Sequence, residues 1–256
     1  MLTREELDKI EQLKNTNPDF QYLFEKIEQE HQYILSQISH SIRNDLTLLM
    51  SSFQFTESSH PEVRSFKYWN GCMNDVIYIR DFLEQLSDYY KSSNITYYPF
   101  NLETMLNDLV HSVQYERYYL PASVILRIED SCPEICGDAM KLYHALELIL
   151  ENSFEAISES DGKIILTLSL MEPFCRISIS DNGSGFSEEM EKKLWTPFTS
   201  DKKHHVGLGL CIANRIILAH GGYIRLAHTS SCGTHLDVYL PLLHSGKYKQ
   251  LIQQTN

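Results

Sequence analysis

A long periodic pattern of apolar positions dominates the first third of the chain. From residue 18 to about residue 56, apolar side chains recur at three- and four-residue steps, with no glycine in the stretch. The pattern predicts one amphipathic helix, longer than most globular helices and more typical of a helical bundle. Asn17 and Pro18 suit its cap and first position. A shorter helix is predicted before it, over residues 3–14.

A second long helix is predicted after a polar break. The stretch "TESSHPE" (56–62) interrupts the apolar period, which resumes from about Val63 to Tyr90. Two antiparallel helices of this kind each bury only one face against the other. A second copy of the same hairpin would cover the remaining faces, so we expect a homodimer through a four-helix bundle.

Beyond residue 100, helical and alternating patterns are mixed. Alternating apolar and polar residues predict strands over "SVILRIE", "KIILTLSL", "FCRISIS", "YIRLAHTS" and "THLDVYLPL". Between them, "NLETMLNDLVHSVQ", "DAMKLYHALELILENSFEAI" and "GLGLCIANRIILAHGG" read as helices. The fold class is therefore α+β, with helices packed on one side of a mainly antiparallel sheet. The expected divisions are an N-terminal helix (1–17), the hairpin (18–95), the mixed domain (96–243) and a polar tail (244–256).

Composition narrows the possible partners and the compartment. Hydrophobic residues make up 43% of the chain and the net charge is −12, so a folded, acidic protein is expected. Without a basic run, nucleic acid and anionic membrane surfaces are poor partners. No apolar stretch is long enough to span a membrane, and no signal peptide is evident. The six cysteines contain no C-x-x-C pair, and we expect reduced thiols in a cytoplasmic protein.

One histidine stands apart from the apolar pattern of the first long helix. In "QISHSIRNDLTLL" (37–49), Ile34, Ile38 and Ile42 cluster on one side when residues are placed at helical spacing. His40 then falls about 200° away from Ile38, on the polar face, with Asn44 one turn further along. The pattern predicts an imidazole that faces solvent.

Two glycine motifs indicate a binding site for phosphate groups. "DNGSG" (181–185) follows a predicted strand, and "VGLGL" (206–210) opens a predicted helix. Each motif alone is also typical of an ordinary turn or tight connection. Together they offer backbone N–H groups and a helix N-terminus to an anion. The polar segment between them contains Lys202 and Lys203, which could reach a phosphate, and Asn152 lies upstream in an apolar helix as a possible Mg²⁺ ligand.

These motifs resemble those of the GHKL ATPases, and of sensor histidine kinases in particular. "DAMKLYHALELILENSFEA" is similar to the N box, "DNGSG" and "VGLGL" to the two glycine boxes, "WTPFTSDK" to the phenylalanine box, and "CGTHLDVYLP" to the closing strand. All five occur in the family's order over residues 100 to 242. The resemblance implies a Bergerat-type ATP-binding catalytic domain that uses ATP and Mg²⁺.

The resemblance also assigns roles to individual residues. Asp181 would contact the adenine amino group, Gly183 and Gly185 would shape the base pocket, and Thr234 would close it. The phosphates and their metal would be bound by Asn152, Lys202, Gly207 and Gly209. The family usually has a second asparagine one turn before the metal ligand, where this chain has Leu148. Affinity for Mg²⁺ is therefore expected to be weakened.

The helix around His40 resembles the family's H box. In "SHSIRNDL", His40, Arg43 and Asn44 match the pattern, which implies that His40 accepts the γ-phosphoryl group of ATP and passes it to an aspartate of a response-regulator receiver domain. Asn44 would position water for dephosphorylation of that receiver. Ser41 stands where the family prefers a carboxylate, which predicts slow autophosphorylation.

The sequence is therefore compatible with three functions. The first is a cytoplasmic two-component histidine kinase that phosphorylates His40. The second is a histidine phosphotransfer or receiver-phosphatase protein with weak or absent autokinase activity, which Ser41 and Leu148 favour and the intact glycine boxes oppose. The third, a regulator that binds ATP without transferring its phosphate, is opposed by the long hairpin with its exposed histidine.

Overall fold

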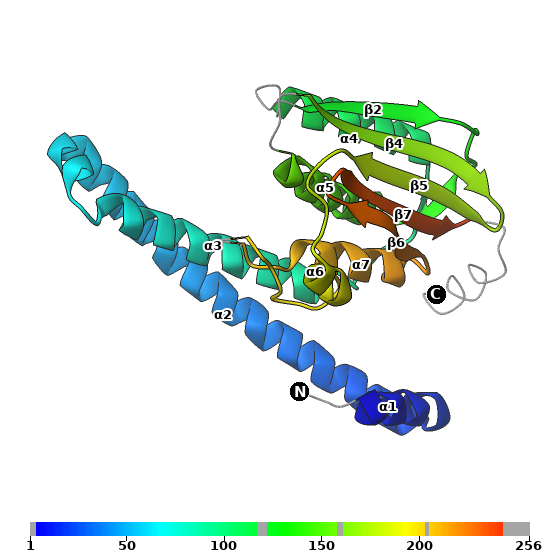
Figure 1. Ribbon diagram of the computed structural model, residues 1–256. Helices are drawn as coiled ribbons and strands as arrows, with labels where there is room; N and C mark the ends of the chain where they lie inside the picture. The colour runs from blue at the N-terminus through cyan, green and yellow to red at the C-terminus, as the bar shows by residue number, and fades with distance from the viewer. Residues whose placement is uncertain (1–3, 117–121, 158–160, 203–204, 243–256) are drawn as a thin grey trace. The chain divides into compact units, whose positions relative to one another are not determined.

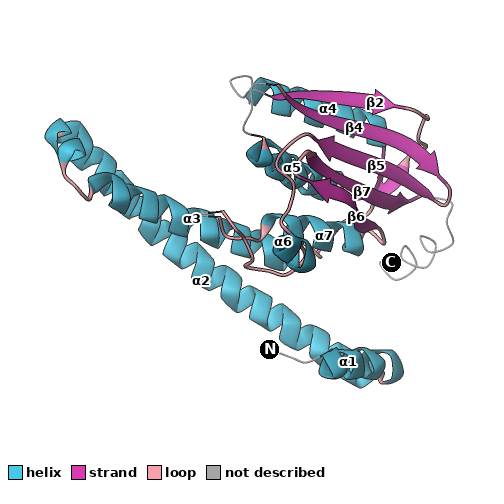
Figure 2. Ribbon diagram, viewed as in Figure 1, coloured by secondary structure: helices cyan, strands magenta, loops and turns pink. Residues whose placement is uncertain are grey.

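The computed structural model describes residues 4–116, 122–157, 161–202 and 205–242 (Figure 1). The chain divides into two compact units, Met1–Tyr90 and Lys91–Asn256. Figure 2 shows that the first unit is helical and that the second combines helices with a sheet. The predicted polar tail lies outside the described residues. No helix among those ranges is long and apolar enough to cross a membrane.

The first unit is a helical hairpin preceded by a short helix. Its elements are α1 (Arg4–Thr16), α2 (Pro18–Ser59), the 3-10 turn η1 (Pro61–Ser65) and α3 (Trp69–Lys91), whose last residue belongs to the second unit. Asn17 caps α2 as predicted, because its Oδ1 accepts the N–H groups of Asp19 and Phe20, each at 3.1 Å. The second long helix begins later than the apolar pattern predicted, because a 3-10 turn occupies its expected first residues.

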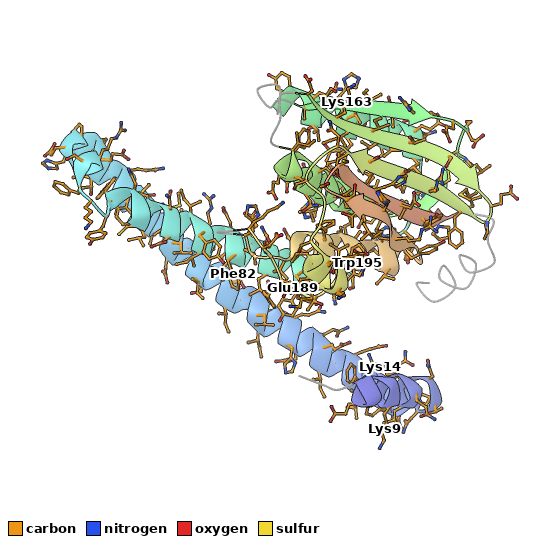
Figure 3. All side chains as sticks on the ribbon, in the orientation of Figure 1. Lys9, Lys14, Phe82, Lys163, Glu189 and Trp195 are labelled. Carbon is orange, nitrogen blue, oxygen red and sulfur yellow. A yellow bond between two sulfur atoms is a disulfide. The ribbon has the colours of Figure 1, made fainter. Side chains whose placement is uncertain are left out.

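The short helix α1 packs against the start of α2. The Lys14 ammonium lies 3.8 Å from the centre of the Phe24 ring and 3.7 Å from Glu28 Oε2 (Lys14 is labelled in Figure 3). A cation over an aromatic face, backed by a carboxylate, is a favourable arrangement at a partly exposed site. These two contacts join α1 to α2.

The face of α2 that packs against α3 differs from the predicted one. Leu46 is buried with Val76 and Leu83 of α3, and Met50 and Phe53 pack against this cluster. Ile38, predicted to lie at the centre of the buried face, is instead 50% exposed. The helix carries apolar residues on two faces about 80° apart, and the single partner helix covers only one of them. Four isoleucines and leucines on the second face are 39–50% exposed: Ile34, Ile38, Ile42 and Leu49.

The second unit contains a five-stranded sheet with helices on one face, which confirms the predicted α+β sandwich. The strand order is β2 (Ala122–Ile128), β4 (Gly162–Met171), β5 (Phe174–Asp181), β7 (Gly233–Pro241) and β6 (Tyr223–Ser230). Only the β2–β4 pair is parallel. Helices α4 (Leu102–Glu116), α5 (Ala139–Ala156) and α7 (Gly209–Ala219) cover one face (Figure 1). The short α6 (Glu188–Lys193) and a small sheet of β1 (Tyr98–Phe100) with β3 (Ile135–Gly137) complete the unit.

The core of this unit lies between the sheet and α5 and α7. Alternate residues of β4, such as Ile164, Leu166 and Leu168, are fully buried, as strand periodicity requires. Helix α5 contributes Leu142 and Ile149, which are also fully buried. The end of α5, the end of β5 and the start of α7 are thereby fixed relative to one another, and the two glycine motifs lie at the end of β5 and the start of α7.

The segment that follows α3 is bonded to the second unit. Arg215 of α7 donates to Ser92 Oγ at 2.9 Å and to Ser93 Oγ at 3.0 Å. Asp138 Oδ2 accepts the N–H and hydroxyl of Thr96, and Tyr97 donates its hydroxyl to the carbonyl of Ala219. These bonds tie residues 92–97 to the start of α5 and to α7 within the second unit.

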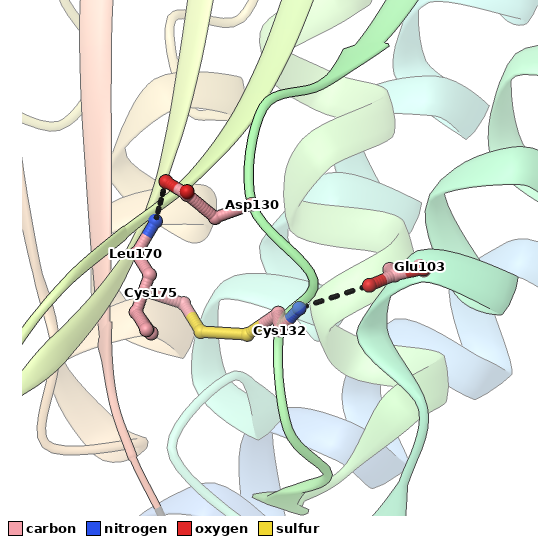
Figure 4. Close-up of a disulfide and its surroundings, with 5 residues drawn as sticks. All are labelled: Glu103, Asp130, Cys132, Leu170 and Cys175. Atoms are coloured by element: carbon pink, nitrogen blue, oxygen red, sulfur yellow. Dashed lines mark hydrogen bonds between the residues drawn. A yellow bond between two sulfur atoms is a disulfide. The ribbon is translucent and has the colours of Figure 1, made fainter.

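A disulfide in the second unit corrects the prediction of six reduced thiols. Cys132 and Cys175 are joined across 43 residues of sequence, with their Cα atoms 6.8 Å apart (Figure 4). Glu103 Oε1 accepts the N–H of Cys132, which holds the connection after β2 in place. The pair was missed because only the folded chain brings this connection beside β5. The other four cysteines are free thiols: Cys72, Cys136, Cys211 and Cys232.

Candidate functional site

The carboxylate of Asp181 organises the first glycine motif. It lies at the end of β5 and is 8% exposed. Its Oδ1 accepts the N–H of Gly183 at 2.9 Å and the N–H of Thr234 at 3.1 Å. The structure thus brings together three residues that the sequence assigned to one site. One carboxylate oxygen orders the loop and the adjacent β7.

The two glycines of this motif are required by close backbone approach. A Cβ on Gly183 would lie 2.7 Å from the Cβ of Ala156 at the end of α5. Gly185 has φ of +69°, and a Cβ there would lie 2.0 Å from the carbonyl oxygen of Ser230. No side chain fits at either place, and the second position also favours glycine by its left-handed backbone. The loop is therefore held between α5 and β6.

The second glycine motif combines a tight turn with an open helix start. Gly207 has φ of +74°, and a Cβ there would lie 2.5 Å from the carbonyl oxygen of Thr199. Gly209 begins α7, and a Cβ there would have only Leu148 Cδ2, at 3.8 Å, as a described neighbour. Packing of the described residues therefore does not require glycine at position 209. The N-cap residue Leu208 makes no side-chain hydrogen bond to the first turn of α7, so its backbone N–H groups are available to attract an anion.

Two residues of α5 hold the predicted lysine. The Lys202 ammonium lies 2.8 Å from Glu155 Oε2 and 3.5 Å from Asn152 Oδ1. His205 Nδ1 lies 3.6 Å from the other oxygen of Glu155. Glu155 was not among the predicted site residues, although its position three residues after Asn152 puts both on the same helix face. Lys203, the alternative lysine, lies outside the described residues.

The donor atoms at this place suit a magnesium ion that brings its own ligands. Among the residues described, no group of three His, Cys, Asp or Glu side chains could hold a metal. Asn152 contributes a single amide oxygen. Mg²⁺ prefers hard oxygen ligands and commonly takes most of them from phosphate and water. The site therefore fits a metal that arrives with a nucleotide.

A buried histidine holds the start of α5. His220 Nε2 accepts the N–H of Asp138 at 2.9 Å, and its Nδ1–H donates to the carbonyl of Ile216 at 2.7 Å. Burial lowers the pKa of His220, so the neutral ring that these bonds require is favoured. Burial alone would raise the pKa of Asp138, but hydrogen bonds from Lys141 and Thr96 outweigh it and lower the pKa. The carboxylate caps α5 through the N–H of Lys141.

In the first unit, His40 is exposed on α2 as predicted. Its Nδ1 lies 3.4 Å from the Asn44 side-chain nitrogen, one helical turn further along. Ser41 and Asp45 are also exposed. The buried Nε of Arg43 has no hydrogen-bond partner among the described residues. The imidazole therefore lies beside the side-chain amide of Asn44. Position 41 carries a hydroxyl group and no carboxylate.

Known proteins are similar in sequence to this chain. Residues 137–244 match the family model of histidine kinase-, DNA gyrase B- and HSP90-like ATPases. The signal transduction histidine-protein kinase AtoS of Escherichia coli strain K12 is 27% identical over 214 residues, which is 83% of this chain and 35% of AtoS. The chain spans less than half the length of this relative.

Two solved structures share the fold. Full-length ShkA in complex with AMPPNP aligns with a TM-score of 0.68 and 18% identity, covering 82% of this chain and 45% of that chain. Histidine kinase ThkA in complex with response regulator protein TrrA aligns with a TM-score of 0.60 and 21% identity, covering 86% of this chain and 66% of that chain.

The sheet, the helices on one face and the two glycine motifs define the second unit as a GHKL-type ATPase domain. Together with the helical hairpin, this domain makes the chain similar to the histidine-protein kinase AtoS across both units.

Proposed function

We propose that the chain is an ATP-dependent protein-histidine kinase that phosphorylates its own His40 and then an aspartate of a response-regulator receiver domain. The observation that carries the proposal is the exposed imidazole of His40 in a chain whose second unit is a GHKL-type ATPase domain. A histidine that must meet a nucleotide bound elsewhere cannot be packed inside its own bundle. The hairpin meets that requirement.

The base of ATP is bound at the end of β5. Asp181 uses Oδ1 for two backbone N–H groups, and its other oxygen accepts the adenine amino group. Gly183 and Gly185 allow the loop to pass close to α5 and β6, which leaves the pocket its shape. Thr234 closes the adenine side, where its N–H is already held by Asp181.

The phosphates are bound between α5 and α7. Asn152 offers its amide oxygen to Mg²⁺, which neutralises phosphate charge when bound. Lys202 reaches the phosphates from its position beside Asn152. Gly207 shapes the turn before α7, and Gly209 leaves the helix N-terminus open to the anion.

Phosphoryl transfer uses the lone pair of a neutral imidazole nitrogen on His40. This nitrogen attacks the γ-phosphorus in line, a nitrogen–phosphorus bond forms, and the bond to the β–γ bridging oxygen breaks to release ADP. Ser41 supplies no carboxylate to accept the second ring N–H. General-base help of that kind contributes roughly 10²- to 10⁴-fold, so the autokinase is slow. Asn44 positions water when the receiver is dephosphorylated.

The same proposal includes a homodimer, a receiver partner and a cytoplasmic location. Ile34, Ile38, Ile42 and Leu49 form an exposed apolar stripe along α2, which a second hairpin would cover. The solved complex of ThkA with TrrA supports a response regulator as partner, because ThkA shares the fold of both units. We retain the division into hairpin and ATP-binding domain as part of this proposal.

A histidine phosphotransfer or receiver-phosphatase protein is the second candidate. Leu148 Cδ2 is the closest neighbour that a Cβ on Gly209 would meet, so an apolar group stands where the family usually has an asparagine. With Ser41, this favours weak autokinase activity.

Incubation with γ-labelled ATP and Mg²⁺ separates the candidates. Acid-labile label that is lost in His40→Ala supports the kinase. Label that enters His40 only from a phosphorylated receiver supports the phosphotransfer protein. Bound ATP without label from either source refutes both and leaves a nucleotide-binding regulator.

A further inference from the structure

Glu155 makes a contact to which the family motifs assign no role. We propose that it is a positioning residue of the nucleotide site, which holds the Lys202 ammonium beside Asn152 until phosphate oxygens of a bound nucleotide take the ammonium over. The inference rests on the proposed ATP site and deepens it, because it names a protein group that competes with the phosphates for their lysine.

The geometry places one carboxylate between two basic side chains. Glu155 Oε2 lies 2.8 Å from Lys202 Nζ, and Oε1 lies 3.6 Å from His205 Nδ1. Asn152, on the same face of α5, offers its Oδ1 to the same ammonium at 3.5 Å. The last turn of α5 therefore binds the lysine through an ion pair and a weaker amide contact.

Nucleotide binding must rearrange these contacts. If a divalent cation were bound to Asn152 Oδ1, it would repel the Lys202 ammonium from that oxygen, so Lys202 would leave Asn152 when a metal–nucleotide complex bound. Glu155 then competes with phosphate oxygens for the ammonium, and its negative charge also repels the phosphates. The cost of binding is set by the strength of one partly exposed ion pair, since the side chains of Lys202 and Glu155 are 32% and 37% exposed. Pairs of that kind correspond to about 1.5- to 5-fold in an equilibrium constant.

The test is a double-mutant cycle on the full chain, read by calorimetric titration with AMPPNP and Mg²⁺. Glu155→Gln keeps the shape of the side chain and removes its charge, and we expect it to tighten binding about 1.5- to 5-fold. In a Lys202→Met background, the same change should have a much smaller effect, because the ion pair is already absent. Glu129→Gln is the matched control: Glu129 is exposed, its backbone N–H bonds Leu168 towards the other end of β4, and the substitution removes the same charge.

Each of the other possible outcomes contradicts a particular step of the proposal. Unchanged or weaker binding by Glu155→Gln, with normal binding by the wild-type chain, refutes the role of Glu155 and leaves the ATP site intact. An equal gain in the Lys202→Met background shows that Glu155 acts on the nucleotide without the lysine, and an equal gain in Glu129→Gln shows a general charge effect. A wild-type chain that binds no nucleotide refutes the ATP site itself.

Discussion

Asp181 offers a way to separate the architecture of the nucleotide site from its recognition of the base. One of its carboxylate oxygens accepts two backbone N–H groups, from Gly183 and Thr234, and the other is proposed to accept the adenine amino group. Asp181→Asn keeps an oxygen for the two N–H groups and turns the remaining atom into a donor. Asp181→Ala removes both functions.

The structure gives the expected size of each effect. In Asp181→Ala, two N–H groups in a site that is 8% exposed lose their acceptor. At about 1–3 kcal/mol for each buried group left unsatisfied, the second unit should lose about 2–6 kcal/mol of unfolding free energy. In Asp181→Asn, the hydrogen bonds to the loop remain. The new side-chain NH2 group then faces the adenine amino group, so two donors meet and one of them stays unpaired. One unpaired donor at about 1–3 kcal/mol weakens ATP binding about 5- to 150-fold.

Two measurements on the full chain check this reasoning. Calorimetric titration with AMPPNP gives the affinity, and amide hydrogen exchange at Gly183 and Thr234 reports whether the loop bonds survive. We expect Asp181→Asn to retain protection and lose affinity, and Asp181→Ala to lose both. Wild-type affinity in Asp181→Asn, or protection of both amides in Asp181→Ala, would contradict the two roles assigned to this carboxylate.

Three further predictions concern pH, catalysis and the segment after α3. Burial lowers the pKa of His220, so the unfolded chain binds more protons than the folded one as pH falls below about 6.5. Stability of the second unit should therefore be complete above that pH and fall below it, a slope that thermal unfolding should show reduced in His220→Asn. Ser41→Glu should raise the initial rate of His40 labelling, by up to about 10²- to 10⁴-fold, and an unchanged rate would show that no base is missing. Arg215→Ala removes two hydrogen bonds to the segment that contains Ser92, so its amides should exchange about 5- to 100-fold faster while AMPPNP affinity is kept.

Local patterns predicted most of the elements and the composition of the site. The cap at Asn17, the alternation in β4 and the helix opened by Gly209 depend on neighbours within a few residues, so they could be predicted from short windows. The residues assigned to the nucleotide site lie in such windows too. From the sequence, Asp181 and Thr234 could be assigned to one site only through the order of the family motifs, since 53 residues separate them.

Other features depend on which segments the fold brings together. The amphipathic pattern of α2 contains two apolar faces, and the pattern does not indicate which of them packs against α3. The Cys132–Cys175 pair and the contact of Glu155 with Lys202 join segments 43 and 47 residues apart.

The two long helices, the mixed domain, the glycine motifs and the solvent-facing histidine could be predicted from local sequence, because each follows from backbone periodicity and from residue chemistry at short range. The tertiary structure alone decided the buried face of α2, the disulfide and the carboxylate that holds Lys202. The reason is that burial and pairing depend on the path of the whole chain, and many paths are compatible with the same local pattern.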